Sequence, residues 1–304
     1  MSMRHISTAA AAVALSIVLV HTAGAAEADY PRKELLIEPA ELAKPESGTK
    51  RVILDARSQA DYSRGHVPQA RRVDHDAWKS AFGDGKDAAD WSRRIGELGI
   101  ARDTEVVIYD DAMSKDAARV WWILRYWGHP RARLLNGGWK GWTAGDFPVT
   151  AEAPAPAEPA RFNARPRATL LVQKDQLVSL LAERKAQIVD ARSEGEFCGE
   201  VTLGNKRGGA MPDARHLEWS ALIDKQTHRF KPADDLQRLF AEAHVDLTKP
   251  TATHCQSGGR SSVMAFALEL MGASEVRNYY NGWSEWGNAD DTPIVIPDKK
   301  PAGK

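Results

Sequence analysis

The 304-residue chain contains two versions of one pattern, and this internal repeat constrains the fold more than any other feature. The stretch VILDARSQADYSRGHVPQAR, from Val52, resembles QIVDARSEGEFCGE and the later RGGAMPDAR, which begin at Gln187. Further on, NGGWKGW from Asn136 matches YNGWSEW from Tyr280. The offset changes from 135 to 144 residues, which places an insertion in the second copy around residues 199–208. A repeat unit of about 120 residues indicates a duplicated domain, because solenoid units are shorter and more numerous.

The repeat and the composition between its copies predict the domain boundaries. We expect a first domain over residues 33–150 and a second over residues 168–297. Residues 151–167 contain AEAPAPAEPARF, whose Pro and Ala content predicts an extended, semi-rigid and solvent-exposed linker.

Residues 1–25 have the features of a secretory signal peptide. A basic start precedes an apolar run over residues 9–20, and small residues follow that run. The apolar run is too short to cross a bilayer, which takes about 20 residues. We therefore expect export to a bacterial periplasm, with no stable membrane association after the signal is removed.

Short apolar runs alternate with longer helical patterns in both copies. This alternation predicts an α/β fold in which helices flank a parallel sheet. The expected strands are residues 52–54, 105–109, 187–189 and 251–254, and the expected central helices are residues 117–127 and 261–271. The second helix is apolar on nearly every face, so we expect it to be buried.

Composition excludes several functional classes. Lys and Arg total 41 and so do Asp and Glu, so no basic excess is available for nucleic acid or an anionic membrane. The nine histidines are scattered without zinc-ligand spacing, and we expect no metal and no organic cofactor. The ten tryptophans are expected in cores and interfaces, since no basic residues interleave with them.

The sequence HCQSGGR, which begins at His254, is the strongest candidate for a reactive site. It follows an expected strand and precedes an expected helix, where open α/β sheets bind ligands. Gly258 and Gly259 allow backbone amides to turn inward, and the helix N-terminus and Arg260 add positive potential. All of these features favour a thiolate at Cys255 and predict a pKa below the ordinary value of about 8.5.

Three alternatives to a nucleophilic Cys255 can be weighed from the residues. A buried structural thiol fits poorly with a polar, glycine-rich loop. A disulfide with Cys198, the default in an oxidising compartment, would consume the nucleophile, and we predict that the two cysteines are not bonded to each other. A tyrosine phosphatase loop needs His-Cys-x5-Arg, whereas only four residues separate Cys255 from Arg260.

Taken together, these residues resemble the rhodanese-like sulfurtransferases, in their tandem two-domain form. The motif Cys255-Gln-Ser-Gly-Gly-Arg260 fits the C-x-x-G-x-R loop of many bacterial members. The Asp-x-Arg strand ends, Gly65-His-Val-Pro68 and the Asn-Gly-Gly-Trp139 segment also match. The resemblance covers about residues 33–292 and implies two α/β domains, each with a parallel five-stranded sheet flanked by helices.

The resemblance also implies the reaction and its residues. Cys255 is the expected nucleophile, and the loop that holds the persulfide comprises Gln256, Ser257, Gly258, Gly259 and Arg260. Arg260 is expected to hold the anionic end of the donor. Only the second domain is expected to be catalytic, because the offset of 144 places Asp111 opposite Cys255 and Asp116 opposite Arg260.

The identity of the sulfur donor stays open at this point. Thiosulfate, with a thiol or cyanide as acceptor, is the favoured interpretation, and the alternatives are 3-mercaptopyruvate as donor or a periplasmic persulfide carrier for a protein partner. Gln256 and Ser257 replace the basic pair of the mammalian thiosulfate enzymes, and the loop does not match the mercaptopyruvate type. Glu196 also stands before Phe197, where many relatives have Arg.

Three further residues are conspicuous but are expected to be structural. Asp190 and Arg192 are interpreted as a salt bridge that braces the strand end rather than as substrate ligands. His66 is interpreted as a hydrogen-bonded loop histidine, with a place facing the interdomain cleft as the alternative.

Overall fold

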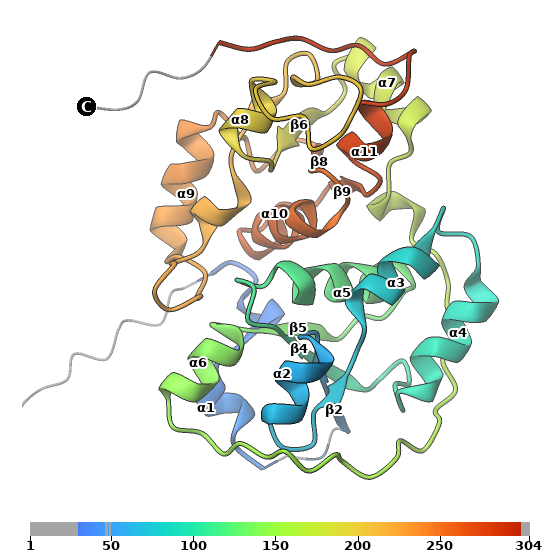
Figure 1. Cartoon of the computed structure of the whole chain (residues 1–304), viewed down its shortest axis with the longest axis vertical. Coiled ribbons are helices and arrows are strands. Elements are labelled where there is room, and N and C mark those ends of the chain that lie inside the picture. Colours follow the sequence, from blue (N-terminus) through green and yellow to red (C-terminus); the bar gives the residue numbers. More distant parts are fainter. Residues whose placement is uncertain (1–29, 46–47, 49, 299–304) are drawn as a thin grey trace, which may run out of the picture.

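The computed structural model describes residues 30–45, 48 and 50–298, and shows two α/β lobes stacked along the long axis (Figure 1). The first lobe holds the blue to green segments and the second the yellow to red ones, as the repeat predicts. The predicted signal peptide, residues 1–25, lies outside the described residues.

In the first lobe, five strands form a parallel sheet in the order β1-β5-β4-β2-β3. The strands are β1 (Leu36–Ile37), β2 (Arg51–Asp55), β3 (Arg71–Arg72), β4 (Glu105–Tyr109) and β5 (Ala132–Leu135). The helices are η1 (Lys33–Leu35), α1 (Pro39–Leu42), α2 (Gln59–Arg64), α3 (His75–Phe82), α4 (Ala88–Glu97), α5 (Lys115–Tyr126) and α6 (Gly138–Ala144).

Helices cover both faces of this sheet, because successive side chains of a strand point to opposite sides. Along β4, Val106 and Ile108 contribute to the core that includes α3, α4 and α5. Val107 and Tyr109 contribute to a smaller core formed with α1 and α6. Burial on both faces explains why β4 is a continuous apolar run and not an alternating one.

The second lobe repeats this plan with a four-stranded parallel sheet in the order β7-β6-β8-β9. The position that β1 occupies in the first sheet is filled here by a single parallel bridge between Leu171 and Asn278, so the expected fifth strand is reduced to one residue pair. The strands are β6 (Gln187–Asp190), β7 (Arg215–His216), β8 (Thr251–His254) and β9 (Val276–Tyr279). The helices are η2 (Ala168–Leu170), α7 (Lys174–Ala182), α8 (Glu194–Phe197), η3 (Trp219–Leu222), α9 (Ala233–Glu242), α10 (Gly259–Leu270) and α11 (Trp283–Trp286).

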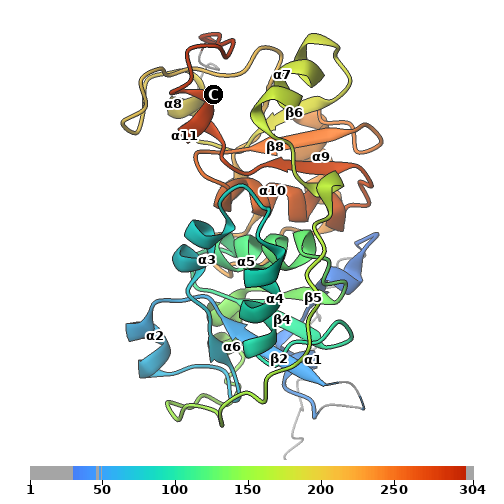
Figure 2. The same cartoon turned by 90° about the vertical axis from the view of Figure 1, so that its right-hand side faces the viewer.

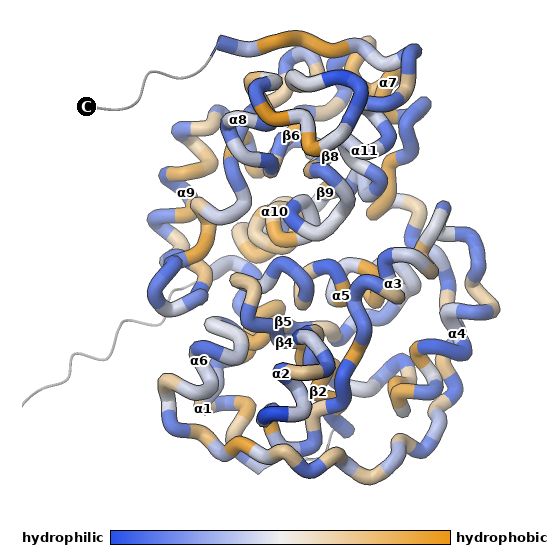
Figure 3. Tube along the Cα trace, viewed as in Figure 1, coloured by the Kyte–Doolittle hydropathy of each residue, from blue (hydrophilic) through white to orange (hydrophobic). Residues whose placement is uncertain are grey.

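The two lobes meet through α5 and α10, whose apolar surfaces join both cores into one cluster. All residues of α10 except Arg260 are buried, which confirms the expectation for this helix. Figure 3 shows the apolar stretches of α10 in orange where the lobes meet. Trp121 packs edge-on against Phe266 at 4.9 Å, and Trp122 stacks on Tyr280 at 4.8 Å between ring centroids.

The linker is extended, as expected, but it is not wholly exposed to solvent. It runs along the side of the first lobe past α4 and up to the second lobe (Figure 2). The amide of Ala160 donates to the carbonyl of Gly96 at 2.9 Å, and Phe162 and Ala164 are buried. The two apolar side chains bury against the first lobe, so the linker is part of the packed structure.

Candidate active site

Cys255 follows the last residue of β8 and lies at the carboxyl edge of the second sheet. The loop that it begins is fixed to the start of α11 by two backbone hydrogen bonds. The amide of Trp283 donates to the carbonyl of Cys255 at 2.7 Å, and the amide of Ser284 donates to the carbonyl of Gln256 at 3.0 Å. The thiol is buried, with 1% of the residue exposed.

Gly258 makes the tight turn from this loop into α10. It is the N-cap of that helix and has a φ of +89°, in the left-handed region that favours glycine. A Cβ atom at this position would lie 2.6 Å from Cε2 of Tyr280, so the ring of Tyr280 leaves no room for a side chain. Gly258 therefore permits both the backbone turn and the close approach of Tyr280.

The surroundings of Cys255 lower the pKa of its thiol, as the sequence predicts. Burial alone raises that pKa, because it disfavours the charged form. The Arg260 guanidinium, hydrogen bonds from the hydroxyl and amide of Ser261, and the amide of Ser257 together outweigh burial and stabilise the thiolate. The net effect is a thiol of lowered pKa, enclosed by hydrogen-bond donors at the N-terminus of a helix.

Arg260 is held by Glu196, the residue that departs from the pattern of the relatives. The Arg260 Nη1 and Nη2 atoms donate to the two carboxylate oxygens of Glu196 at 2.6 and 2.8 Å. Glu196 is buried and also accepts a hydrogen bond from the hydroxyl of Ser193 at 2.9 Å. This contact uses one N–H of each terminal nitrogen of Arg260 and holds its positive charge beside the sulfur, and the Nε–H and the remaining terminal protons are still available as donors.

The insertion of the second copy reaches the loop that follows Cys255. Asn205 and Gln256 exchange two side-chain hydrogen bonds, at 3.1 and 3.2 Å, and Asn288 donates to Asn205 at 2.9 Å. The side chain of Gln256 therefore holds the insertion against the loop. The five predicted loop residues form one segment directly after Cys255, and two of them, Ser257 and Arg260, act on its sulfur.

Asp190 and Arg192 form the buried salt bridge that was expected at the strand end. The Arg192 Nη2 atom lies 2.5 Å from Oδ2 of Asp190, and the Arg192 guanidinium stacks over the ring of Trp283 at 4.0 Å. His254 Nε2 is 3.4 Å from the same carboxylate. Burial lowers the pKa of His254 to about 4, so His254 is neutral at physiological pH.

The first domain has the same brace. Asp55 and Arg57 are paired at 2.6 Å, and Arg57 lies over Trp139 at 3.9 Å. Asp190–Arg192 and Asp55–Arg57 therefore occupy equivalent places in the two copies. Their recurrence at both strand ends supports a structural role for the motif.

In the first domain, Asp110 and not Asp111 takes the place of Cys255. The Trp139 amide donates to the carbonyl of Asp110 at 2.8 Å, as the Trp283 amide does to Cys255. The expected match with Asp111 was wrong because the first-domain loop is one residue longer. The carboxylate of Asp110 accepts backbone hydrogen bonds at 2.8–3.0 Å from Ala112, Ser114, Asp116 and Ala117. This loop thus keeps its anion-binding geometry but fills it with its own side chain.

Three residues at the site were missed by the sequence reasoning. Ser261 follows Arg260 directly, and its hydroxyl in the first turn of α10 was the signal that could have found it. Tyr280 belongs to a repeat motif but was not assigned a contact. Arg119 comes from α5 of the first domain, and its Nη1 atom donates to the carbonyl of Ser257 at 2.9 Å. No local pattern in the sequence connects Arg119 with the loop.

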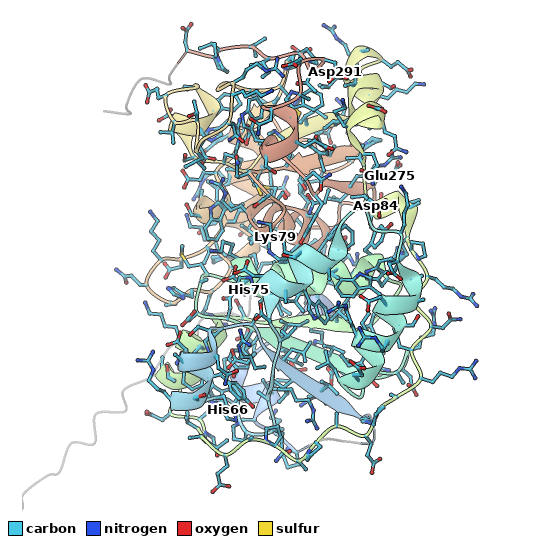
Figure 4. The ribbon with its side chains drawn as sticks, turned by 45° about the vertical axis from the view of Figure 1, so that its right-hand side comes forward. His66, His75, Lys79, Asp84, Glu275 and Asp291 are labelled. Carbon is cyan, nitrogen blue, oxygen red and sulfur yellow. The ribbon has the colours of Figure 1, made fainter. Side chains whose placement is uncertain are left out.

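His66 and Cys198 lie away from this site. Figure 4 shows His66 at the end of the first lobe remote from the second, so the interdomain alternative is wrong. Its ring nitrogens contact the carbonyls of Tyr62 and Glu152 at 2.9 and 3.2 Å, as expected for a hydrogen-bonded loop histidine. Cys198 is buried at the C-terminal cap of the short helix α8. It is not bonded to Cys255, as predicted.

Within residues 30–45, 48 and 50–298, no three or more His, Cys, Asp or Glu side chains gather in a way that could hold a metal ion. None of the helices in this part of the chain has the length and apolarity needed to cross a bilayer.

Known proteins resemble this chain over nearly all of the two lobes. The model of the rhodanese-like domain matches residues 38–145 and again residues 173–289. A thiosulfate sulfurtransferase of Azotobacter vinelandii is 34% identical over 273 residues, which are 88% of this chain and 99% of that protein. A sulfur carrier protein of Thermus thermophilus is 32% identical, over 77% of this chain and 86% of that protein.

Among solved structures, a 3-mercaptopyruvate sulfotransferase of Escherichia coli superposes with a TM-score of 0.70 at 27% identity. The match covers 82% of this chain and 98% of that one. The two family matches coincide with the two lobes and with the internal repeat. The chain belongs to the rhodanese-like family, as a member with two such domains in tandem.

Proposed function

We propose that this protein is a thiosulfate sulfurtransferase that works through a persulfide on Cys255. The Cys255 thiolate attacks the terminal sulfur of thiosulfate, a new sulfur–sulfur bond forms, and sulfite leaves with the electron pair of the broken bond. A thiol or cyanide then takes the outer sulfur and regenerates the thiolate. The observation that carries this proposal is the buried Cys255 sulfur among hydrogen-bond donors, with a lowered pKa. Relatives named thiosulfate sulfurtransferase at 32–37% identity support the choice of donor.

The loop has two tasks in this mechanism. Its amides and the Ser261 hydroxyl stabilise the thiolate before the reaction and the anionic persulfide after it. The turn at Gly258 orients these N–H and O–H groups before thiosulfate binds, so they do not have to reorganise during the reaction. The loop provides this stabilisation from residues of the chain alone.

Arg260 supplies the positive charge that an anionic donor meets at the sulfur. Its guanidinium lowers the pKa of Cys255 and raises the local potential for anions. Its bidentate contact with Glu196 keeps that charge in one place. We propose that Arg260 attracts the donor electrostatically and that the loop amides make the direct contacts.

A second candidate function is that of a persulfide carrier for a protein acceptor, supported by the Thermus relative that is named a sulfur carrier. The structural likeness to a 3-mercaptopyruvate enzyme keeps that compound as an alternative donor. Both candidates use the same Cys255 persulfide, and they differ from the main proposal only in the molecule that delivers or receives the sulfur.

Kinetics and mass spectrometry test these proposals together. Thiosulfate and 3-mercaptopyruvate are compared side by side with the purified protein, and kcat/KM identifies the better donor. After thiosulfate treatment, the peptide containing Cys255 should gain one sulfur, about 32 Da. Poor turnover with both donors, together with a stable persulfide that only a protein acceptor discharges, would support the carrier. A protein that acquires no sulfur would contradict all three.

We also propose that the protein is exported to the periplasm through residues 1–25. The support is the basic start, the short apolar run and the small residues near position 25. The mass of the protein recovered from a periplasmic extract tests this directly, because removal of the signal shortens the chain by about 25 residues.

A further inference from the structure

Arg119 reaches from the first domain into the catalytic loop of the second. It belongs to the second turn of α5 and is buried, with 6% of the residue exposed. Its Nη1 atom donates to two acceptors, the carbonyl of Ser257 at 2.9 Å and the hydroxyl of Tyr280 at 3.0 Å. A Cβ atom on Gly259 would lie 2.7 Å from its Nη2 atom, so the guanidinium also lies against the start of α10.

Both acceptors of Arg119 belong to the structure that surrounds the sulfur. The amide of Ser257 hydrogen-bonds to the Cys255 sulfur, and the carbonyl of the same residue is the group that Arg119 holds. The ring of Tyr280 packs against Gly258, where the loop turns into α10. One guanidinium therefore restrains the loop at Ser257 and, through Tyr280, at Gly258.

Arg119 also acts on the sulfur through its charge. Its cation and the Cys255 thiolate attract each other, and so do Arg260 and the thiolate. Arg260 from α10, Arg119 from α5 and the phenol of Tyr280 after β9 all interact with the charge of Cys255. Asp116 offsets part of the Arg119 charge, Glu196 pairs with Arg260, and the neutral His254 precedes Cys255. The first domain consequently contributes a cation to a site in the second.

We propose that Arg119 is a positioning residue for sulfur transfer, which gives the first domain a direct part in the reaction. This inference rests on the proposed function of Cys255. The first domain carries no thiol of its own, yet through Arg119 it fixes the carbonyl of Ser257 and holds a positive charge near the sulfur. The loop is then oriented by contacts from both domains.

The simpler alternative is that Arg119 only holds the two domains together. Arg125, on the same helix, provides a matched control for this alternative. Its Nη2 atom contacts Glu269 of α10 at 2.8 Å, and both side chains are buried. Loss of Arg125 removes a buried contact across the same interface without touching the loop.

The experiment compares Arg119→Gln, Arg119→Lys and Arg125→Gln in the full chain. The rate of iodoacetamide addition to the Cys255 peptide is followed against pH by mass spectrometry, with the thermal midpoint and kcat/KM for thiosulfate measured alongside. For Arg119→Gln we expect the alkylation midpoint to rise by about one pH unit, which is about tenfold in thiolate fraction at low pH. Arg119→Lys should restore much of the midpoint but little of kcat/KM, because an ammonium keeps the charge without the planar fork.

Arg125→Gln should lower the thermal midpoint and leave the alkylation midpoint unchanged. Equal alkylation midpoints in Arg119→Gln and wild type, or equal shifts in the Arg119 and Arg125 variants, would overturn the proposal. If Arg119→Gln does not fold, Tyr280→Phe removes one of the two acceptors and should raise the midpoint by a smaller amount. A wild-type protein that transfers no sulfur, but whose alkylation midpoint still depends on Arg119, would contradict the proposed function and retain Arg119 as a residue that orients the loop.

Discussion

Replacing Arg260 with Met removes the strongest positive charge beside Cys255 while keeping a side chain of similar length. Two effects follow from the structure. The thiolate loses the cation that does most to lower its pKa. Glu196, whose side chain is 6% exposed, is left as a buried carboxylate without its bidentate partner, next to a second anion.

The size of the effect can be estimated from these contacts. A charge-assisted interaction contributes about 1.5–3 kcal/mol, so kcat/KM for thiosulfate should fall by about 10- to 150-fold. Part of that loss comes from the unpaired carboxylate of Glu196. The double variant Arg260→Met with Glu196→Gln should therefore be more active and more stable than Arg260→Met alone, because it buries no unpaired charge.

The assay measures kcat/KM with thiosulfate and cyanide, together with thermal unfolding, for both single variants and the double variant. Arg238→Met is the control, because the ion pairs of Arg238, with Asp235 and Glu242 on α9, are exposed. Unchanged kinetics in Arg260→Met would refute the electrostatic argument and leave Arg260 as a brace for α8. Equal kcat/KM and thermal stability in the double variant and in Arg260→Met would show that the unpaired Glu196 carboxylate lowers neither activity nor stability.

Three further changes test the site. Cys255→Ser should abolish sulfur transfer, because an alkoxide is not populated at neutral pH, while Cys198→Ser should leave turnover largely intact; the reverse result in a thiocyanate assay would place the nucleophile at Cys198. Gly258→Ala should lower both the thermal midpoint and kcat/KM, since the left-handed turn and the ring of Tyr280 both oppose a Cβ atom, and wild-type values in both measurements would contradict this. Burial lowers the pKa of His254 from 6.5 to about 4, so the unfolded chain binds a proton that the folded protein excludes; its stability contribution is present above pH 6.5 and is lost towards pH 4. In His254→Gln the thermal midpoint should therefore fall less steeply between pH 6.5 and 4, and an identical slope would argue against a neutral His254.

Much of the fold could be predicted from local patterns in the chain. The repeat indicated two domains, and the strands expected at 105–109 and 251–254 coincide with β4 and β8. The apolar run of β4 is visible in the sequence because a strand buried on both faces needs apolar residues on both. The candidate reactive loop was also predicted from local sequence. A cysteine, two glycines and an arginine between a strand and a helix are close in sequence, so their combined chemistry is visible without the rest of the structure.

The misjudged details depended on packing. The fifth strand of the second sheet was expected from the family resemblance, but only the pair Leu171 and Asn278 forms there. The linker was expected to be exposed, but Phe162 and Ala164 find apolar partners on the first lobe. The residue of the first domain that matches Cys255 was predicted one position too late, as Asp111 instead of Asp110. The offset came from a distant motif, which does not reveal the one extra residue in the first-domain loop.

The partners of the loop came from distant parts of the chain. Arg119 and Ser257 are 138 residues apart in sequence, and Glu196 and Arg260 are 64 apart, yet each pair is joined by hydrogen bonds. The periodicity of α5 shows that it is a buried helix but not which of its residues faces the loop of another domain. That choice depends on how α5 and α10 pack against each other. The chemistry of Cys255 and the charge of Arg260 can therefore be derived from neighbours in the chain, whereas Glu196 and Arg119 are brought to the loop only by tertiary packing, and Arg119 by the packing of the two domains.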